Sequence, residues 1–277
     1  MKTLLTILAH PDDESFGMGG TLAKYAREGV DVHIAIATDG AAGSVAEGYE
    51  DARAELAAVR AIELDKAVEA LGGTLHRLGY RDSGMTGDPA NQHPRAWINA
   101  DQDEAIGRMV ALIRQLKPDV IVTHDETGGY FHPDHIQCWN IVTPAFTAAA
   151  DPAQYPEAGP AHQAKRLYYS AVADSLVKIR IWMVKLRGED PTQVGRNKDI
   201  DLTRIGHPAR KIHTRVNIRP YWDAKIEASK HHASQGGGST FLRYMPLWIF
   251  KLLFRHETFM RAYPPVSDGF RETDFFE

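Results

Sequence analysis

Short apolar runs alternate with segments of helical periodicity through the first half of this 277-residue chain. The apolar runs are Leu4 to Ala9, Val32 to Thr38, Thr74 to Leu78 and Asp119 to Thr123, and the helical segments are Gly20 to Glu28, Asp51 to Leu71 and Asp103 to Leu116. Strands that alternate with helices need crossover connections, which give a mostly parallel sheet with helices on both faces. The sequence therefore predicts an α/β, Rossmann-like fold with its ligand crevice at the carboxyl ends of the strands.

The pattern weakens beyond Ala150. Arg166 to Val172 is a candidate strand, and Pro220 to Ser234 is a candidate helix with proline near its start. Leu176 to Leu186 fits both the helical and the strand period, and its length favours a helix. We interpret residues 1–277 as a single domain, in which residues 1–150 form the core and residues 151–277 complete the substrate site.

Charge and cysteine content narrow the class of protein. The formal net charge of -4 argues against nucleic-acid binding, although His162 to Lys230 is basic and is either a solvated face or a surface that attracts anionic substrates or lipid headgroups. The single cysteine, Cys138, excludes an intramolecular disulfide and suits a reducing compartment. The first apolar run meets His10 without a cleavage site, and no run reaches the roughly 18 residues of a spanning helix. We expect a cytoplasmic protein without a transmembrane segment.

Two loops that follow predicted strands are rich in metal-binding side chains. His10 to Glu14 (HPDDE) follows the first run, and His124 to His135 (HDETGGYFHPDH) follows the fourth. They offer imidazole and carboxylate without thiolate, a ligand mixture typical of a catalytic zinc site with an open position for water. Asp12 and Asp13 are adjacent, so one can reach the metal while the other accepts a proton from the bound water. Such a site suits attack of hydroxide on an unreactive carbonyl.

Other interpretations of these loops stay open. Either loop alone could be a turn or a helix cap, although two His-Pro-Asp units after strands of one sheet make coincidence a poor explanation. Gly17, Gly19 and Gly20, with Asp39 at the end of the second run, also suggest a dinucleotide-binding module. These glycines lack the G-x-G-x-x-G spacing, and carboxylates stand where a pyrophosphate would sit. A non-catalytic sugar- or nucleotide-binding protein, which would bind its ligand without metal, is the remaining alternative.

The two loops resemble a known family. AHPDDE (residues 9–14) and GGYFHPDH (residues 128–135) are similar to the zinc-dependent N-acetylglucosaminyl deacetylases, a PIG-L-like or LmbE-like family that includes the mycothiol and bacillithiol pathway deacetylases. LGYRDSGM (residues 78–85) is most similar to the mycothiol branch. The resemblance implies a Rossmann-like hydrolase that removes an acetyl group from the 2-amino nitrogen of a glucosamine-containing small molecule. It implies Zn²⁺ as cofactor, with Fe²⁺ or another divalent metal as the alternative in vivo.

The resemblance also implies roles for individual residues. His10, Asp13 and His135 would be the metal ligands, and Asp12 would be the general base. The remaining catalytic positions would be His132, which protonates the leaving amine or stabilises the oxyanion, Tyr130, a second oxyanion donor, and Asp134, which orients a histidine. The residues that match sugar-binding positions are Arg60, Asp82 and His232. An exposed helix arginine and a turn aspartate are the structural alternatives for Arg60 and Asp82.

Two features depart from the family pattern. Phe131 stands where the family usually has glycine, so a bulky ring is expected to narrow or reshape the entrance. Phe241 to Phe254 (FLRYMPLWIFKLLF) is unusually apolar, and either a core or homo-oligomer contact or a substrate lid or membrane-surface contact would explain it. Both features weaken an assignment to mycothiol synthesis itself. An amidase acting on a thiol conjugate or an acylated antibiotic would use the same site residues.

Overall fold

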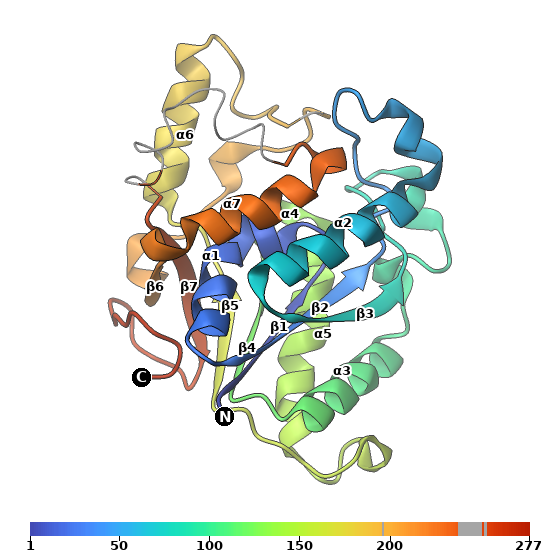
Figure 1. The fold of residues 1–277 in the computed structure, drawn as a ribbon, viewed down its shortest axis with the longest axis vertical. Helices are drawn as coiled ribbons and strands as arrows, with labels where there is room; N and C mark the ends of the chain where they lie inside the picture. Colours follow the sequence, from blue (N-terminus) through green and yellow to red (C-terminus); the bar gives the residue numbers. More distant parts are fainter. Residues whose placement is uncertain (196, 238–250, 252–253) are drawn as a thin grey trace.

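Seven strands form one sheet in the computed structural model, which describes residues 1–195, 197–237, 251 and 254–277 (Figure 1). The strands are β1 (Thr3–Leu8), β2 (Asp31–Thr38), β3 (Thr74–Tyr80), β4 (Val120–His124), β5 (Arg166–Ser170), β6 (Thr214–Asn217) and β7 (His256–Tyr263). Their order is β3-β2-β1-β4-β5-β7-β6; β1 to β5 are parallel, and β7 is antiparallel to both of its neighbours. The predicted mostly parallel sheet is confirmed.

Helices cover both faces of the sheet. One layer is α1 (Asp13–Arg27), α2 (Leu56–Leu71) and α7 (Trp222–His231), and the other is α3 (Gln102–Leu116) and α5 (Pro133–Ala150). Each layer packs on the sheet through its own hydrophobic core, one containing Leu22, Leu64 and Ala228 and the other Ile113 and Ile141. The α/β architecture with helices on both faces is therefore confirmed.

The central position of β1 brings two loops together. All six residues of β1 are buried, and the strand pairs in parallel with β2 on one side and β4 on the other. Strand order reverses at this point, since the chain goes outward from β1 to β3 and then returns to β4. In open α/β sheets, ligands bind beyond the carboxyl ends of the strands at such a switch point. The segments that follow β1 and β4 meet there.

Several element boundaries differ from those predicted. α1 begins at Asp13 rather than Gly20, because the helix starts directly after the His-Pro-Asp loop and continues through a kink at Met18, where φ is -141°. α5 was not predicted, since buried residues such as Cys138, Ile141 and Ala145 hide its helical period and Pro144 lies inside it. β6 and β7 were also missed. The helix favoured for Leu176 to Leu186 is present as α6 (Asp174–Leu186).

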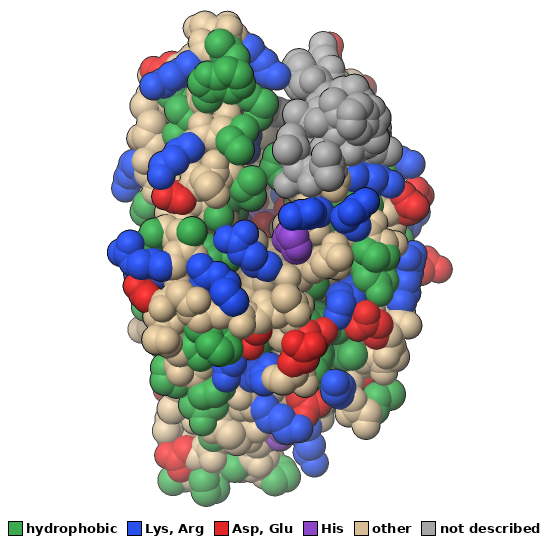
Figure 2. Space-filling view, turned by 90° about the vertical axis from the view of Figure 1, so that its left-hand side faces the viewer, with side chains coloured by type: hydrophobic (Ala, Val, Ile, Leu, Met, Phe, Trp, Pro, Cys, Tyr) green, Lys and Arg blue, Asp and Glu red, His purple; other side chains and the backbone are tan. Residues whose placement is uncertain are grey.

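α6 exposes apolar and basic side chains side by side. Ile179, Trp182 and Leu186 are 45%, 61% and 66% exposed. Figure 2 shows hydrophobic and Lys or Arg side chains close together on the face of the molecule that carries this helix. Apart from residues 251 and 254, the predicted apolar contact segment Phe241 to Phe254 lies outside the described residues. Within the described part of the chain, no helix is long and apolar enough to cross a membrane.

Arg114 ties α3 to the end of α5. Its side chain is 1% exposed and donates to the backbone carbonyls of Ala148, Ala149, Asp151, Gln154, Tyr155 and Gly159. The last carbonyls of a helix have no partner within the helix, and a cation there also interacts favourably with the helix dipole. One guanidinium therefore satisfies the end of α5 and the loop after it.

Replacing Arg114 with Leu is expected to lower the free energy of unfolding by about 3 kcal/mol, because buried carbonyls would lose their donor. Arg108→Leu is the matched control: Arg108 lies on the same helix, is partly exposed and donates to the single carbonyl of Leu78. Chemical denaturation of both variants measures the difference. Equal losses would show that the carbonyl cluster is satisfied without Arg114.

Candidate active site

The loops after β1 and β4 supply most of the predicted site residues. His10, Asp12 and Asp13 lie between β1 and the first turn of α1. Tyr130 belongs to α4 (Gly128–Phe131), a short kinked turn in which Gly129 has φ +73°. His132 is the N-cap of α5, and Pro133 occupies the first helical position, where proline needs no backbone donor. The local sequence therefore directs both loops toward the same end of the sheet.

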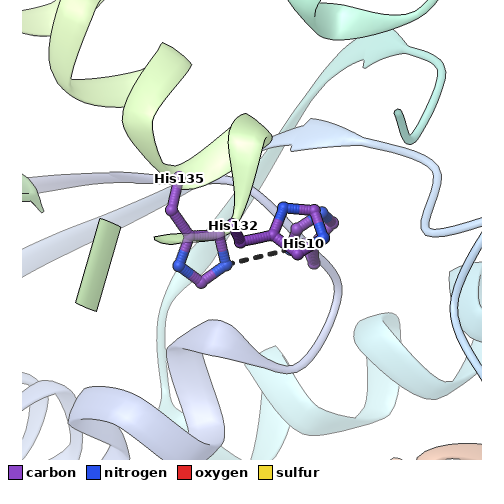
Figure 3. Close-up of side chains that lie close together, drawn as sticks. All are labelled: His10, His132 and His135. Carbon is purple, nitrogen blue, oxygen red and sulfur yellow. Dashed lines mark hydrogen bonds between the residues drawn. The ribbon is translucent and has the colours of Figure 1, made fainter. Parts of the chain in front are cut away.

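Two imidazole nitrogens face each other at the centre of the site (Figure 3). Nδ1 of His10 lies 3.1 Å from Nε2 of His135. The Asp13 carboxylate is 3.6 Å from the His10 nitrogen and 3.4 Å from the His135 nitrogen. These distances bring the three predicted metal ligands together around one point.

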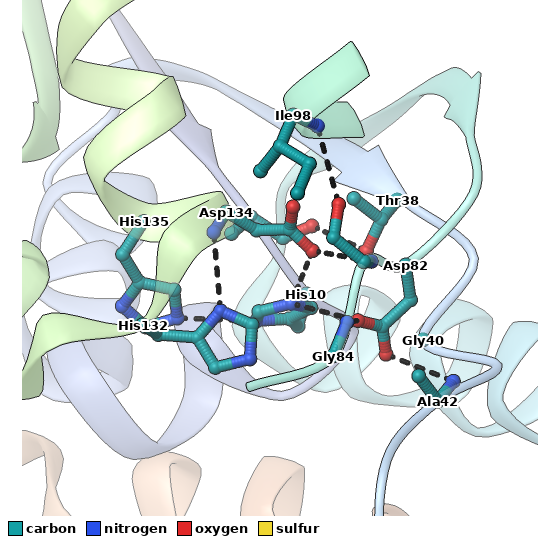
Figure 4. Close-up of polar contacts among 12 residues, drawn as sticks. His10, Thr38, Gly40, Ala42, Asp82, Gly84, Ile98, His132, Asp134 and His135 are labelled. Carbon is teal, nitrogen blue, oxygen red and sulfur yellow. Dashed lines mark hydrogen bonds and ion pairs between the residues drawn. The ribbon is translucent and has the colours of Figure 1, made fainter. Parts of the chain in front are cut away.

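The outer hydrogen bonds of both histidines determine which nitrogen carries the proton. Nδ1 of His135 donates to the carbonyl of Gly128, 3.0 Å away, which leaves Nε2 as an acceptor. Nε2 of His10 faces the carboxylates of Asp134 at 3.2 Å and Asp82 at 3.5 Å, which leaves Nδ1 as an acceptor when the ring is neutral (Figure 4). Burial opposes protonation of His10, but the facing Asp82, Asp134 and Asp13 carboxylates outweigh it and raise the pKa of His10, so a proton on Nδ1 donates to Nε2 of His135. A cation that replaced this proton would meet two imidazole lone pairs and the Asp13 carboxylate. This donor set suits a cation, and it combines the imidazole and carboxylate ligands that divalent metals accept.

His124, the last residue of β4, is a further member of this cluster. Its Nε2 lies 3.4 Å from Asp13, and its ring stacks on that of His135 with centroids 3.8 Å apart. Asp13, His124 and His135 form one set of neighbouring ligand atoms, while His10, His132 and His135 form an overlapping set. Nε2 of His124 also accepts the backbone N–H of Ala9, which occupies its lone pair. No individual role was predicted for His124. Its position at the carboxyl end of a buried strand was the feature that could have indicated one.

Asp12 is held in a strained conformation by a buried arginine. Its φ is +143°, a region that residues with a side chain rarely adopt and that is often found at functional sites. Nη2 of Arg60 donates to the Asp12 carboxylate at 3.0 Å and to the carbonyl of Pro11, and Nη1 donates to Gly40. Arg60 is 2% exposed, so it is not the surface arginine of the structural alternative. Burial raises the pKa of Asp12 to about 6, against the opposing charge of Arg60.

His132 and Tyr130 border the same space. Nδ1 of His132 accepts the backbone N–H of Asp134, so the neutral ring carries its proton on Nε2. Burial, with a smaller effect from His10, lowers the pKa of His132 to about 3. Burial and the Asp13 carboxylate raise the pKa of the Tyr130 hydroxyl well above its ordinary value. Both side chains are therefore held in forms that can donate one hydrogen bond.

Phe131 adopts the left-handed conformation, with φ +67°. This region favours glycine, the residue that the resembled family usually has at this position. The guanidinium carbon of Arg204 lies 4.3 Å from the centroid of the Phe131 ring. The bulky residue is thus accommodated together with a cation from the second half of the chain.

The predicted sugar-binding residues Asp82 and His232 are buried beside the site. Asp82 is 2% exposed, accepts the backbone N–H groups of Ala42 and Gly84, and faces His10 (Figure 4). His232 is fully buried, and its Nε2 lies 2.7 Å from the Glu14 carboxylate. Glu14 also accepts the backbone N–H of Asp12. Substrate contact by Asp82 and His232 remains a prediction, while the geometry links both residues to His10 and Asp12.

Comparison with known proteins identifies the family. Residues 5–146 match the family model of PIG-L, described as GlcNAc-PI de-N-acetylase. The chain belongs to this family. A relative from Geodermatophilus obscurus, named 1D-myo-inositol 2-acetamido-2-deoxy-alpha-D-glucopyranoside deacetylase, is 39% identical over 247 residues, which cover 84% of this chain and 83% of the relative. The chain is therefore an enzyme of the N-deacetylase class.

Solved structures share the fold at low sequence identity. The N,N'-diacetylchitobiose deacetylase from Pyrococcus horikoshii is 21% identical with a TM-score of 0.65, and covers 94% of this chain and 83% of its own. The 4-carboxy-2-hydroxymuconate hydratase from Pseudomonas putida is 18% identical with a TM-score of 0.64, and the match covers 97% of this chain and 99% of the hydratase. A hydratase and a deacetylase on one fold show that the fold alone does not decide the reaction.

The buried Glu14–His232 pair generates a pH-dependent stability. Burial opposes protonation of His232, but the facing Glu14 and Asp12 carboxylates outweigh it and raise the pKa of His232. A raised pKa contributes stability below the unfolded value of about 6.5, and this contribution is lost as pH rises through the folded pKa. Relative to the wild type, His232→Gln is therefore expected to lose more unfolding free energy at pH 5 than at pH 9.

Urea denaturation at both pH values measures this difference. Glutamine keeps a donor for Glu14 and removes the charge, so the pH trend isolates the charge. His162→Gln is the control, because His162 bonds the carbonyl of Pro118 rather than a carboxylate. A loss at position 232 that does not change with pH would contradict the charged pair.

Proposed function

We propose that His10, Asp13 and His135 hold a catalytic Zn²⁺ and that the enzyme removes the N-acetyl group from a glucosamine-containing small molecule. The observation that carries this proposal is the convergence of Nδ1 of His10, Nε2 of His135 and the Asp13 carboxylate within 3.1–3.6 Å of one another. A bound zinc ion would lower the pKa of its water and polarise the amide carbonyl. The other roles fall to side chains around this point.

Asp12 is the proposed general base. It adjoins the ligand Asp13, and Arg60 holds its carboxylate in place. A pKa of about 6 leaves the carboxylate ionised at neutral pH, yet close enough to the working pH to accept a proton efficiently. Arg60 then acts through Asp12, in addition to any contact with the sugar.

His132 and Tyr130 are the proposed oxyanion donors. The hydrogen bond from the Asp134 N–H to Nδ1 leaves the His132 proton on Nε2, and the low pKa keeps the ring neutral. A neutral Nε2–H can stabilise the negative oxygen of a tetrahedral intermediate. Of the two roles predicted for His132, this geometry favours oxyanion stabilisation over protonation of the amine. The hydroxyl of Tyr130 is the second donor, and Asp134 orients His10.

The proposed substrate is an N-acetylglucosaminide with a small polar aglycone. The Geodermatophilus relative is named for an inositol-linked 2-acetamido sugar, and the Pyrococcus structure is a diacetylchitobiose deacetylase, so both names contain an N-acetylated glucosamine. Phe131 stands where the family usually has glycine, and the bulky ring that is expected to reshape the entrance argues for an aglycone that differs from that of the relative. We further propose a cytoplasmic location and one domain over residues 1–277.

Metal content and deacetylation measured together test this function. Purified protein is expected to carry about one metal ion per chain, and release of acetate from N-acetylglucosaminyl-inositol should stop on chelation and return with Zn²⁺ or Fe²⁺. Parallel assays with N-acetylglucosamine, a cysteine-conjugated amide and an acylated glycopeptide separate the substrate alternatives. A metal-free protein that binds these sugars without hydrolysing them would replace the hydrolase with a binding protein.

Asp12→Asn and His135→Ala distinguish the role of a general base from that of a metal ligand. Asp12→Asn should keep its metal and lose activity by about 10²–10⁴-fold, because proton transfer to a positioned base contributes that much. His135→Ala should lose both metal and activity, since one imidazole ligand is removed. Elemental analysis and initial rates give the two readouts. An Asp12→Asn enzyme with nearly full rate would exclude Asp12 as the base.

Arg60→Met tests whether the charge of Arg60 lowers the pKa of Asp12. Activity falls as pH drops through the pKa of the base, at about 6 or lower when a bound cation favours the carboxylate. Without the Arg60 charge this pKa rises, so the acid limb of the kcat/KM profile should move to higher pH. Arg53→Met is the control, because Arg53 is exposed and bonds the carbonyl of Gly43. An unchanged limb with a raised KM would make Arg60 a substrate-binding residue alone.

A further inference from the structure

A segment from the second half of the chain packs on the loop that carries Tyr130 and His132. This segment, Asp174 to Lys211 without the undescribed Arg196, contains α6 and is called the α6 excursion below. It has its own small core, in which Val177 and Val184 of α6 meet Leu202. It leaves the sheet after β5 and returns to it at β6. Two of its side chains contact residues 125–131, the segment that follows β4.

The first contact is a hydrogen bond between His207 and Asp125. Nε2 of His207 lies 2.7 Å from the Asp125 carboxylate, and the two residues are 8% and 1% exposed. The other oxygen of Asp125 accepts from the N–H and hydroxyl of Thr127 and from the N–H of Gly129. Asp125 therefore fixes the backbone of the turn, and His207 fixes Asp125.

The second contact restrains the far end of the same turn. Gly128, Gly129 and Phe131 all have positive φ, at +60°, +73° and +67°. A residue with a side chain in this region is strained and persists only where its surroundings hold it. Arg204 lies over the ring of Phe131 in a cation–π contact, with its guanidinium carbon 4.3 Å from the ring centroid. The α6 excursion thus holds the turn at both ends.

Two hydrogen bonds hold the backbone of His207 in place. Its N–H donates to the carbonyl of Val172, and its carbonyl accepts from the N–H of Asp174, both at 2.9 Å. Gly206 before it has φ +99°, and a Cβ at this position would lie 2.9 Å from the Cα of Asp174. The His207 imidazole therefore projects from backbone that is hydrogen-bonded to the segment directly after β5, and β5 is the neighbour of β4.

We propose that His207 and Arg204 are positioning residues for the deacetylase site, which act through the turn at residues 125–131. The turn supplies the Gly128 carbonyl, which receives the Nδ1 proton of His135, and it carries Tyr130 toward the site. Without the His207 bond, Asp125 loses a charge-assisted partner and the strained turn relaxes. The catalytic part of this inference rests on the proposed function, whereas the restraint of the turn does not.

Hydrogen exchange and kinetics of His207→Ala test the proposal. Exchange of the amides of residues 127–131 should accelerate at least tenfold while those of β1 stay unchanged. The kcat for an N-acetylglucosaminide should fall about tenfold, while KM should stay within twofold of the wild-type value. Tenfold is the lower end of the loss that follows mutation of residues that hydrogen-bond to metal ligands. His207→Gln keeps an N–H donor for Asp125, so its amide exchange and its kcat should both be close to those of the wild type. His162→Ala is the control for loss of a histidine remote from the turn.

The outcomes distinguish the inference from the proposed function. Wild-type exchange and kcat in folded His207→Ala would overturn the positioning role. If the wild-type protein lacks deacetylase activity while His207→Ala still accelerates exchange at residues 127–131, the proposed function is refuted and the restraint of the turn is kept. If His207→Ala does not fold, Arg204→Gln decides by the same two readouts, because Arg204 is exposed and its removal leaves the His207 bond intact. Arg204→Gln is then expected to accelerate exchange at Phe131, and unchanged exchange there would overturn the proposal.

Discussion

The parallel pairing of β1 with β4 is the constraint on which the rest of the structure depends. It places two polar loops at one end of two fully buried strands, at the point where strand order reverses. One loop brings Asp12 and Asp13, and the other brings His132 and His135. Neither loop is a site alone, because the ligand atoms come from both. A shift of either strand along the other would separate the imidazole of His10 from that of His135.

The second constraint is the cost of burying so many ionisable groups. A buried charge is tolerated when it is paired and hydrogen-bonded, and three carboxylates around this site each have such a partner. Asp12 meets Arg60, Glu14 meets His232 and Asp125 meets His207. These pairs assign each group its charge before any substrate arrives. The acid–base chemistry is thus an outcome of burial and pairing together, drawn from segments far apart in the chain.

The sequence predicted the parallel strands and, in the second half, β5, α6 and α7, whereas α5, β6 and β7 were missed. β1, β2 and β4 were recognisable because strands buried on both faces are continuous apolar runs. α5 escaped because it is apolar on most sides, and β6 and β7 because antiparallel pairing depends on distant partners. The metal-ligand candidates were recognisable from two His-Pro-Asp motifs. Among the partners of these motifs, Arg60, Asp82 and His232 were named as sugar-binding positions. His207 was not named, because its contact with Asp125 arises only from tertiary packing.

His132 serves both the reaction and the fold. Its ring accepts the N–H of Asp134 as the N-cap of α5, and the same hydrogen bond places the ring proton on the nitrogen proposed to face the oxyanion. An N-cap residue typically contributes about 1 kcal/mol to a helix. Loss of activity on alanine substitution here would therefore mix a chemical effect with a loosened helix start that also carries His135. Separating the two requires a substitution that caps the helix without an imidazole, and asparagine has the geometry to do so.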